Sequence, residues 1–218
     1  RKKKLPFVIG KIATSKNNII YSTKLKKITD KHSDKLTHFL RYKNDSILIS
    51  YKTLNKDNPK LNCRLSGLEK FSPKRIILDN NLNTKIDSYI FNTANKENTI
   101  IFYNNANKQK ISLFKKKGIQ LIKSNLTKIK YFDLKLVLKK LYKIGIRNIL
   151  VEGGNNLSGS FLKNKLLNQF YLFKSPKILT KSAPYKDFNH IKYLIQNYRI
   201  KSKINNKLTK DTITLYKN

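Results

Sequence analysis

Short apolar runs and amphipathic segments alternate along most of the chain. The apolar runs are typical of buried strands, and they predict strands at residues 7–14, 46–50, 75–79, 99–103, 118–122, 148–152, 171–179 and 212–216. Helical spacing predicts a helix over 30–42, which Thr29 can cap, and another after Asp133 that ends at Gly145. A third helix is predicted to open at 157–163.

This alternation favours an α/β fold with helices on the faces of a sheet. The stretch 52–67 is rich in turn residues, and Asn58-Pro59 is its strongest break. The stretch 181–210 is polar and weakly patterned, so no element is assigned there. Because the 218 residues contain no repeat or long linker, we expect one domain, 1–218, in which residues 1–4 are a linker or the end of an upstream domain.

Charge changes this picture, because the formal net charge is +36. Such a surface favours nucleic acid, an anionic membrane or acidic small molecules. However, only six of the 48 basic residues are Arg, the residue that makes bidentate contacts with bases and phosphates. Lys, Asn and Ile are enriched together, and their codons are rich in adenine and thymine. We interpret the charge as codon drift and expect neither nucleic acid nor membrane as a partner.

The cysteine and histidine content argues against a disulfide within the chain and against a metal site. The single cysteine, Cys63, forms no disulfide within the chain and no cysteine-rich zinc site, and the three histidines lack the spacing of metal ligands. We therefore expect no metal. No apolar run approaches the ~18 to 20 residues of a membrane helix, so a cytoplasmic protein is expected. The chain contains no Met, and we expect that it continues a longer protein.

The stretch LVEGGNNLSGSFL, residues 150–162, is the first candidate site. It places Glu152 at the end of a strand and two glycines before a helix. Glycines let backbone N–H groups approach a ligand, and a helix N-terminus favours a phosphate or pyrophosphate. The alternative is an ordinary tight turn with a solvated carboxylate, since the stretch is not the GxGxxG pattern of dinucleotide-binding folds.

Two arginines and an aspartate form the second candidate site. Arg41 and Arg64 stand out because Arg is scarce, and a guanidinium can hold a phosphate through two bonds where Lys cannot. Asp57 precedes the Asn-Pro break, in a loop expected to follow a strand. The alternatives are a helix-surface pair of Arg41 with Asp45 and an Asx-turn at Asp57.

Taken in order, the motifs resemble those of one family. KIATS, HxLR, DSIL, T(x)3DNPxLxxR, RIILD, VEGGxxLxGxFL and SPKIL follow one another between about Leu5 and Tyr216. This order resembles the reductase domain of the bifunctional riboflavin-biosynthesis deaminase-reductase. The resemblance implies a fold like that of dihydrofolate reductase, which is an α/β fold with a mostly parallel central sheet, flanking helices and a reversed C-terminal strand.

The resemblance also implies a reaction. The family reduces the ribosyl group of 5-amino-6-(5-phosphoribosylamino)uracil to the ribityl group with NADPH. The substrate, a small phosphorylated pyrimidine, would contact Arg41, Leu61, Arg64 and Glu152. NADPH would contact Ala13, Lys27, Thr53, Asp57, Asn80, Gly153, Gly154, Asn155, Asn156, Leu157, Ser158, Gly159 and Ser160. No firm proton donor emerges, and the catalytic candidates are Lys11, Asp57, Glu152 or a water.

The chain departs from the family pattern at five places. Lys16-Asn17-Asn18 replaces Leu-Asp-Gly, Leu25 replaces a substrate-binding Ser, Lys27 replaces Trp, Asn58 replaces the second Asp of D-D-P, and Asn155-Asn156 replaces Pro-Thr or Pro-Ser. Only a backbone contact of the Trp position carries over. One cysteine cannot supply the zinc signature of the deaminase half. A fusion to an upstream zinc deaminase domain and a homodimer are left open.

Two rival functions remain. A dihydrofolate reductase would need an acidic residue placed to protonate a pterin, and two arginines for a phosphate fit folate poorly. A basic nucleic-acid-binding module that kept the fold without catalysis is the second rival. Arg75, Arg147 and Arg199 lie outside the two candidate sites, and we expect Lys to be tolerated at these three positions.

Overall fold

The computed structural model describes residues 4–23, 27–180, 184–205 and 207–217, which form two compact units. Unit 1 comprises Arg1–Phe7 and Arg41–Ile149, and unit 2 comprises Val8–Leu40 and Leu150–Asn218. Each unit therefore combines segments that are distant in the sequence. The family departure at Leu25 lies outside the described residues.

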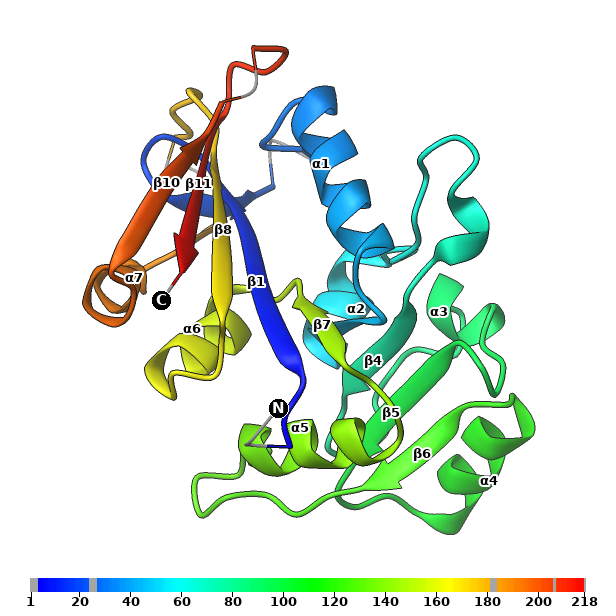
Figure 1. Ribbon diagram of the computed structural model, residues 1–218. Helices are drawn as coiled ribbons and strands as arrows, with labels where there is room; N and C mark the ends of the chain where they lie inside the picture. The colour runs from blue at the N-terminus through cyan, green and yellow to red at the C-terminus, as the bar shows by residue number, and fades with distance from the viewer. Residues whose placement is uncertain (1–3, 24–26, 181–183, 206, 218) are drawn as a thin grey trace. The chain divides into compact units, whose positions relative to one another are not determined.

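Unit 1 contains a parallel sheet with the strand order β3, β4, β5, β6, of which Figure 1 labels the last three. The bounds of these strands are Ser46–Ser50, Lys74–Leu78, Thr99–Tyr103 and Gln120–Lys123. The first three are apolar runs with consecutive buried residues. Such continuous burial is the pattern of a parallel strand covered on both faces.

Helices connect the strands of unit 1, namely α2 (Tyr51–Asp57), α3 (Tyr89–Asn92), α4 (Lys108–Lys116) and α5 (Leu134–Lys143), with a 3-10 turn at Glu69–Phe71. The helix predicted after Asp133 is confirmed, because Asp133 Oδ1 accepts a hydrogen bond from Leu136 N at 3.1 Å and caps α5. Gly145 follows the end of α5 with φ 93°, a conformation that glycine adopts without strain.

Unit 2 contains a sheet with the strand order β10, β11, β8, β1 (Figure 1). The bounds are Ile200–Ile204, Thr212–Lys217, Gln169–Lys174 and Phe7–Thr14. β1 and β8 are parallel, whereas β11 is antiparallel to both β8 and β10. The reversed C-terminal strand is therefore confirmed. A separate antiparallel pair joins β2 (Ile19–Ser22) to β9 (Tyr185–Asp187).

The remaining elements are α1 (Lys31–Tyr42), β7 (Asn148–Val151), α6 (Asn155–Lys163) and α7 (Ile191–Asn197). Strand β7 leads into α6 through three residues, as the candidate stretch predicts. The largest fully buried side chains include a group of phenylalanines in unit 2, Phe161, Phe170, Phe173 and Phe188. The predicted α/β class with a mostly parallel sheet is confirmed.

Three details correct the prediction. Helix α2 occupies the first part, 52–57, of the stretch predicted as turns, because Ser50 caps it by accepting a bond from Thr53 N. Asp30 rather than Thr29 caps α1, because Asp30 Oδ1 accepts bonds from the amides of His32 and Ser33, both at 2.9 Å. The unassigned stretch 181–210 contains β9, α7 and β10.

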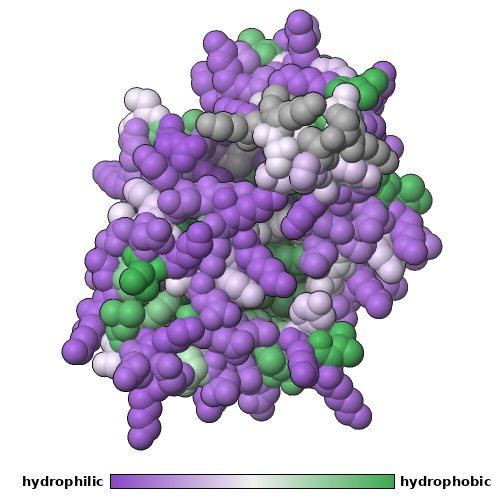
Figure 2. Space-filling view, turned by 180° about the vertical axis from the view of Figure 1, so that it is seen from behind, coloured by the Kyte–Doolittle hydropathy of each residue, from purple (hydrophilic) through white to green (hydrophobic). Residues whose placement is uncertain are grey.

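Hydrophilic residues dominate the face shown in Figure 2, which agrees with 48 basic residues among 218. Within the part of the chain that the structure describes, no helix combines the length and apolarity needed to cross a membrane. The same described residues include no group of three or more His, Cys, Asp or Glu side chains that could hold a metal ion.

Candidate active site

The two units each hold part of the predicted site. Unit 1 holds Arg41, Thr53, Asp57, Leu61, Arg64 and Asn80, and unit 2 holds Lys11, Ala13, Lys27, Glu152 and residues 153–160. The two sets are described separately below.

Arg41 and Arg64 both contact Asn62 in unit 1. Arg41 lies in the last turn of α1, is 9% exposed, and donates from Nη1 to the backbone oxygen of Asn62 at 3.2 Å. Arg64 is exposed and donates from Nη1 to Asn62 Oδ1 at 3.0 Å. One residue therefore brings the two predicted phosphate ligands together, although they lie 23 positions apart in the sequence.

The loop between α2 and Arg64 contains two residues in the left-handed region. Asn58 has φ 39° and ψ 53° and ends α2, and its Oδ1 accepts a bond from Tyr89 N at 2.8 Å. Leu61 has φ 53° and is 3% exposed. Asn tolerates this region, but Leu adopts it at a cost of about 1 to 3 kcal/mol, which the surrounding structure must offset. Asn58 thus keeps the turn despite its departure from the D-D-P motif.

Thr53 and Asp57 lie on α2, which corrects the prediction of a loop at Asp57. The hydroxyls of Thr53 and Ser50 lie 3.2 Å apart at the start of the helix. Asp57 is exposed and is the last residue of the helix. A carboxylate at a helix C-terminus opposes the helix dipole, so helix stability does not account for this residue. A role toward a ligand stays a prediction.

Asn80 follows β4, at the carboxyl end of the strand, where ligands of open α/β sheets bind. Its backbone oxygen accepts bonds from Asn104 N and Asn105 N, and its Nδ2 donates to Lys130 O at 3.3 Å. The preceding residue, Asp79, is fully buried and accepts bonds from Asn83 N, Thr84 N and the Thr84 hydroxyl. These bonds fix the backbone at Asn80.

Lys11 and Ala13 share the less buried face of β1 in unit 2. Residues alternate along this strand, so that Ile12 and Thr14 are buried on the other face. Lys11 Nζ lies 4.7 Å from the ring centroid of Phe173 on β8. The hydroxyl of Thr14 is buried and has no hydrogen-bond partner among the described residues.

The turn after β1 explains one departure from the family pattern. Asn18 has φ 64°, the left-handed conformation that a glycine would otherwise supply, and Asn is the residue that best replaces glycine there. Asn17 accepts a bond from the Ser15 hydroxyl at 2.7 Å and donates to Leu179 O at 2.8 Å. The Lys-Asn-Asn sequence therefore still forms a tight, bonded turn.

Glu152 and Gly153 connect β7 to α6 in unit 2, and Glu152 is half-buried. Gly154 is the N-cap of α6, with φ −70° and ψ −175°, and no side chain caps the helix. Ser158 N donates to Gly154 O at 3.1 Å, whereas the amides of the first turn precede any intrahelical acceptor. The start of α6 thus carries the uncapped N–H groups and partial positive charge that suit an anion.

Farther along α6, the polar side chains bond to the helix itself. The Ser158 hydroxyl is buried and donates to Gly153 O at 3.2 Å, and the Ser160 hydroxyl donates to Asn156 O at 2.8 Å. A cofactor contact of either hydroxyl stays a prediction. Within the run 153–160, Gly153 and Gly154 have the positions that most favour a cofactor contact.

Gly159 has a packing role that the sequence did not reveal. A Cβ at Gly159 would overlap Nε2 of His190, so the imidazole packs directly on the helix backbone. His190 also forms an edge contact with Phe188 and stacks near Tyr193. Burial, with a smaller contribution from Lys192, lowers the pKa of His190 and favours its neutral form. His190 thus helps to hold α6 in place.

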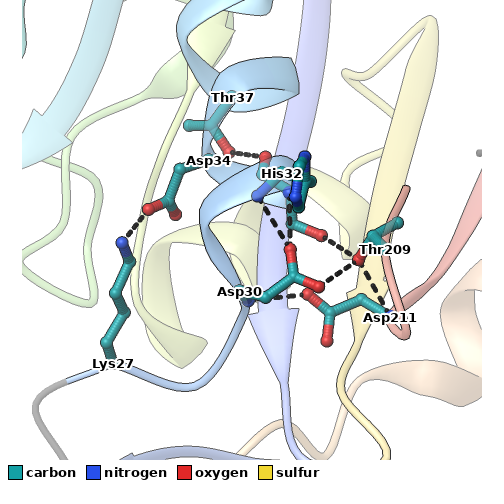
Figure 3. A network of polar contacts seen from close by, with 8 residues as sticks. Lys27, Asp30, His32, Asp34, Thr37, Thr209 and Asp211 are labelled. Carbon is teal, nitrogen blue, oxygen red and sulfur yellow. Dashed lines mark hydrogen bonds and ion pairs between the residues drawn. The ribbon is translucent and has the colours of Figure 1, made fainter.

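Lys27 forms an ion pair with Asp34 of α1 (Figure 3). Its side chain is 58% exposed. The partner of this side chain is therefore a carboxylate of its own unit, whereas the predicted cofactor contact involves the backbone of Lys27. That contact stays a prediction.

The sequence matches one known family over most of its length. The family model of the RibD C-terminal domain matches residues 10–196. This chain belongs to that family. The predicted resemblance to a riboflavin-biosynthesis reductase domain is therefore confirmed.

Members of the family show how far the likeness extends. The riboflavin biosynthesis protein RibD of Aquifex aeolicus is 32% identical over 190 residues, which cover 87% of this chain and 51% of that protein. The 5-amino-6-(5-phosphoribosylamino)uracil reductase of Buchnera aphidicola subsp. Acyrthosiphon pisum is 31% identical over 168 residues, covering 72% of this chain and 77% of that protein. The chain spans about half the length of the first RibD relatives that it matches.

A solved structure of Acinetobacter baumannii RibD has the same fold. It superposes with a TM-score of 0.76 at 22% identity, covering 98% of this chain and 58% of that chain. This likeness confirms the predicted dihydrofolate-reductase-like α/β fold.

Proposed function

We propose that this RibD C-terminal domain reduces the ribosyl group of 5-amino-6-(5-phosphoribosylamino)uracil to the ribityl group with NADPH. The meeting of Arg41 and Arg64 at Asn62 carries the proposal, because two guanidinium groups suit a phosphate monoester. The Buchnera relative bears the name of this activity. A folate substrate lacks the phosphate that such a pair would bind.

The chain offers a fitting place for NADPH at the start of α6. An uncapped helix N-terminus preceded by two glycines supplies backbone donors without bulky side chains, and Gly154 is the N-cap itself. Asn155 and Asn156 form the first turn of the helix, and Asn155 Oδ1 accepts a bond from Asn189 N at 3.3 Å. When bound, NADPH supplies the hydride. Thr53, Asp57 and Asn80 of unit 1 and Ala13 and Lys27 of unit 2 are the further proposed contacts.

The chain's own residues would orient the substrate and move protons. The ribose ring must open before its C1 can accept a hydride, and the oxygen released by opening then needs a proton. Lys11, Asp57 and Glu152 are the proposed donors, with a water as the alternative. Glu152, half-buried at the end of β7, is proposed to accept bonds from ribose hydroxyls. Leu61 is proposed to contact the substrate from its left-handed backbone position.

One assay tests the proposal directly. Purified protein is mixed with NADPH and the phosphoribosylamino-uracil substrate, and loss of NADPH absorbance is followed beside parallel reactions with NADH and with dihydrofolate. We expect oxidation with the phosphoribosylamine and NADPH, and little with dihydrofolate. Turnover of dihydrofolate alone, or no turnover together with salt-sensitive binding of nonspecific DNA, would support one of the rival functions instead.

A further inference from the structure

We propose that Asn62 is a positioning residue that orients both arginines of the phosphate site and thereby sets the preference for a phosphorylated substrate. This inference rests on the proposed function and extends it to a residue outside the recognised motif positions. No sequence pattern points to Asn62, since it stands at an unspecified position of the motif between Leu61 and Arg64.

Asn62 uses two different atoms for the two arginines. Its backbone oxygen accepts from Arg41 Nη1 at 3.2 Å, and its side-chain Oδ1 accepts from Arg64 Nη1 at 3.0 Å. The backbone contact is independent of the side chain, but the Arg64 contact requires a side chain that can accept a hydrogen bond. A substitution at Asn62 can therefore separate the two contacts.

The neighbours of Asn62 hold it firmly. Leu61 is buried in the left-handed region, and Cys63 is fully buried with its amide donating to the Ser72 hydroxyl at 3.1 Å. Because the residues on both sides are anchored, the position of Asn62 is set by the fold rather than by the arginines. This is the property required of a residue that orients others.

The charges explain what this arrangement is suited to bind. Two cationic groups gathered at one neutral amide repel each other, and an anion between them offsets that repulsion, a dianion more than a monoanion. A guanidinium has five N–H donors, so one orienting bond to Asn62 is compatible with a two-bond contact to phosphate. The chemistry favours a phosphate monoester.

The test uses Asn62→Ala, which removes Oδ1 but keeps the backbone oxygen. Ribose 5-phosphate is the binding probe, and kcat and KM are measured with the phosphoribosylamine and with its dephosphorylated form. We expect Kd for ribose 5-phosphate and KM for the phosphorylated substrate to rise roughly tenfold, as for one lost hydrogen bond to a charged group. We expect kcat, and turnover of the dephosphorylated form, to stay close to those of the parent.

A double variant separates positioning from general stability. In an Arg64→Ala background, Asn62→Ala should have little further effect, because the group that it orients is absent. Asn125→Ala, at an exposed position of unit 1, is the matched control and should behave like the parent. Equal losses of kcat on both substrates, or additive losses in the double variant, would show a structural role and overturn the inference.

The binding measurement with ribose 5-phosphate tests this inference separately from the proposed function. If the parent binds ribose 5-phosphate, the Asn62→Ala variant binds it more weakly, and no reductase activity is found, then the function fails and the role of Asn62 stands. If activity is found but Asn62→Ala binds the probe as the parent does, then the function stands and the role of Asn62 is wrong. A parent that binds no ribose 5-phosphate also overturns it.

Discussion

At the scale of single residues, Arg75 shows that an Arg in this lysine-rich chain need not belong to a ligand site. It is 6% exposed, and its guanidinium donates to Thr99 Oγ1, Thr93 Oγ1, the Thr93 backbone oxygen and Asn98 Oδ1 at 2.6 to 3.1 Å. Burial lowers the pKa of Arg75, but a guanidinium stays charged at any ordinary pH. Codon drift to Lys would have lost this four-bond arrangement.

We therefore expect Arg75→Lys to destabilise unit 1, which corrects the expectation that Lys is tolerated there. A Lys ammonium cannot reach four acceptors arranged around a planar fork, so the free energy of unfolding should fall by about 1 to 3 kcal/mol. Urea denaturation of the purified variant measures the change. Arg199→Lys, at an exposed position, is the control and should match the parent. A stability equal to that of Arg199→Lys would mean that the buried bonds contribute nothing.

At the scale of elements, the start of α6 makes the cofactor proposal testable. Gly154 has an extended backbone that any residue adopts, so Gly154→Val should fold. Its branched side chain would nevertheless stand at the uncapped helix N-terminus. We expect Kd for NADPH to rise at least about tenfold, the effect of losing one charge-assisted contact. Fluorescence titration with NADPH measures this, and circular dichroism checks the fold.

A smaller substitution provides the control for Gly154→Val. Gly154→Ser adds little bulk and a good capping group, so it should bind NADPH more tightly than the Val variant while folding at least as well. If a folded Gly154→Val protein bound NADPH as tightly as the parent does, the phosphate of the cofactor would have to bind elsewhere.

The elements that the sequence predicted best are those with a strong local signal. The buried runs at Phe7–Thr14, Ser46–Ser50 and Thr99–Tyr103 have the predicted bounds, because each is a compact apolar run with a proline or polar residue at its start. α4 was missed because it buries only Phe114 on a lysine-rich surface, which leaves little periodicity. α2 was misread because turn residues near Asn58 obscured a helix with one buried residue, Leu54.

The candidate site was only partly predictable for a different reason. The motifs identified Arg41 and Arg64, but their meeting at Asn62 depends on a left-handed Leu61, which no local preference indicates. The contact between His190 and Gly159 likewise joins residues 31 positions apart. Tertiary contacts of this kind require the fold, because the sequence pattern records only local periodicity.

At the scale of the whole molecule, several of the few carboxylates share one structural role, which is to accept hydrogen bonds from backbone amides. The chain has 12 acidic residues against 48 basic ones. Several accept hydrogen bonds from backbone amides, as Asp45 does from Arg147 N and Asn148 N, Asp79 from Asn83 N, and Asp133 from Leu136 N. A Lys or Asn at these positions would lose such charge-assisted bonds. These three carboxylates thus supply acceptors to backbone amides that Lys could not supply.

Asp30 likewise connects the two chain segments that make up unit 2, Val8–Leu40 and Leu150–Asn218 (Figure 3). Besides capping α1, its Oδ2 accepts from the Thr209 hydroxyl at 2.6 Å and from Lys210 N at 3.3 Å, and its own amide donates to Asp211 Oδ2 at 2.9 Å. Burial alone would raise the pKa of Asp30, but the bonds from Thr209, Ser33, Lys210 and His32 outweigh it and lower that pKa.

These bonds predict how the stability of the protein depends on pH. Because the pKa of Asp30 is lower in the folded chain, its ionised form contributes stability above its unfolded value, about 3.9, and this contribution is lost as the pH falls through the folded value. Asp30→Asn keeps an oxygen that can cap α1 but removes the negative charge at the helix N-terminus, so it should unfold more easily than the parent at pH 7, by about 0.5 to 1 kcal/mol. The difference should shrink as the pH falls from 5 toward 3. Thermal unfolding at each pH measures it, with the exposed Asp87→Asn as control. An equal difference at pH 7 and pH 3 would mean that the charge of Asp30 does not stabilise the folded protein.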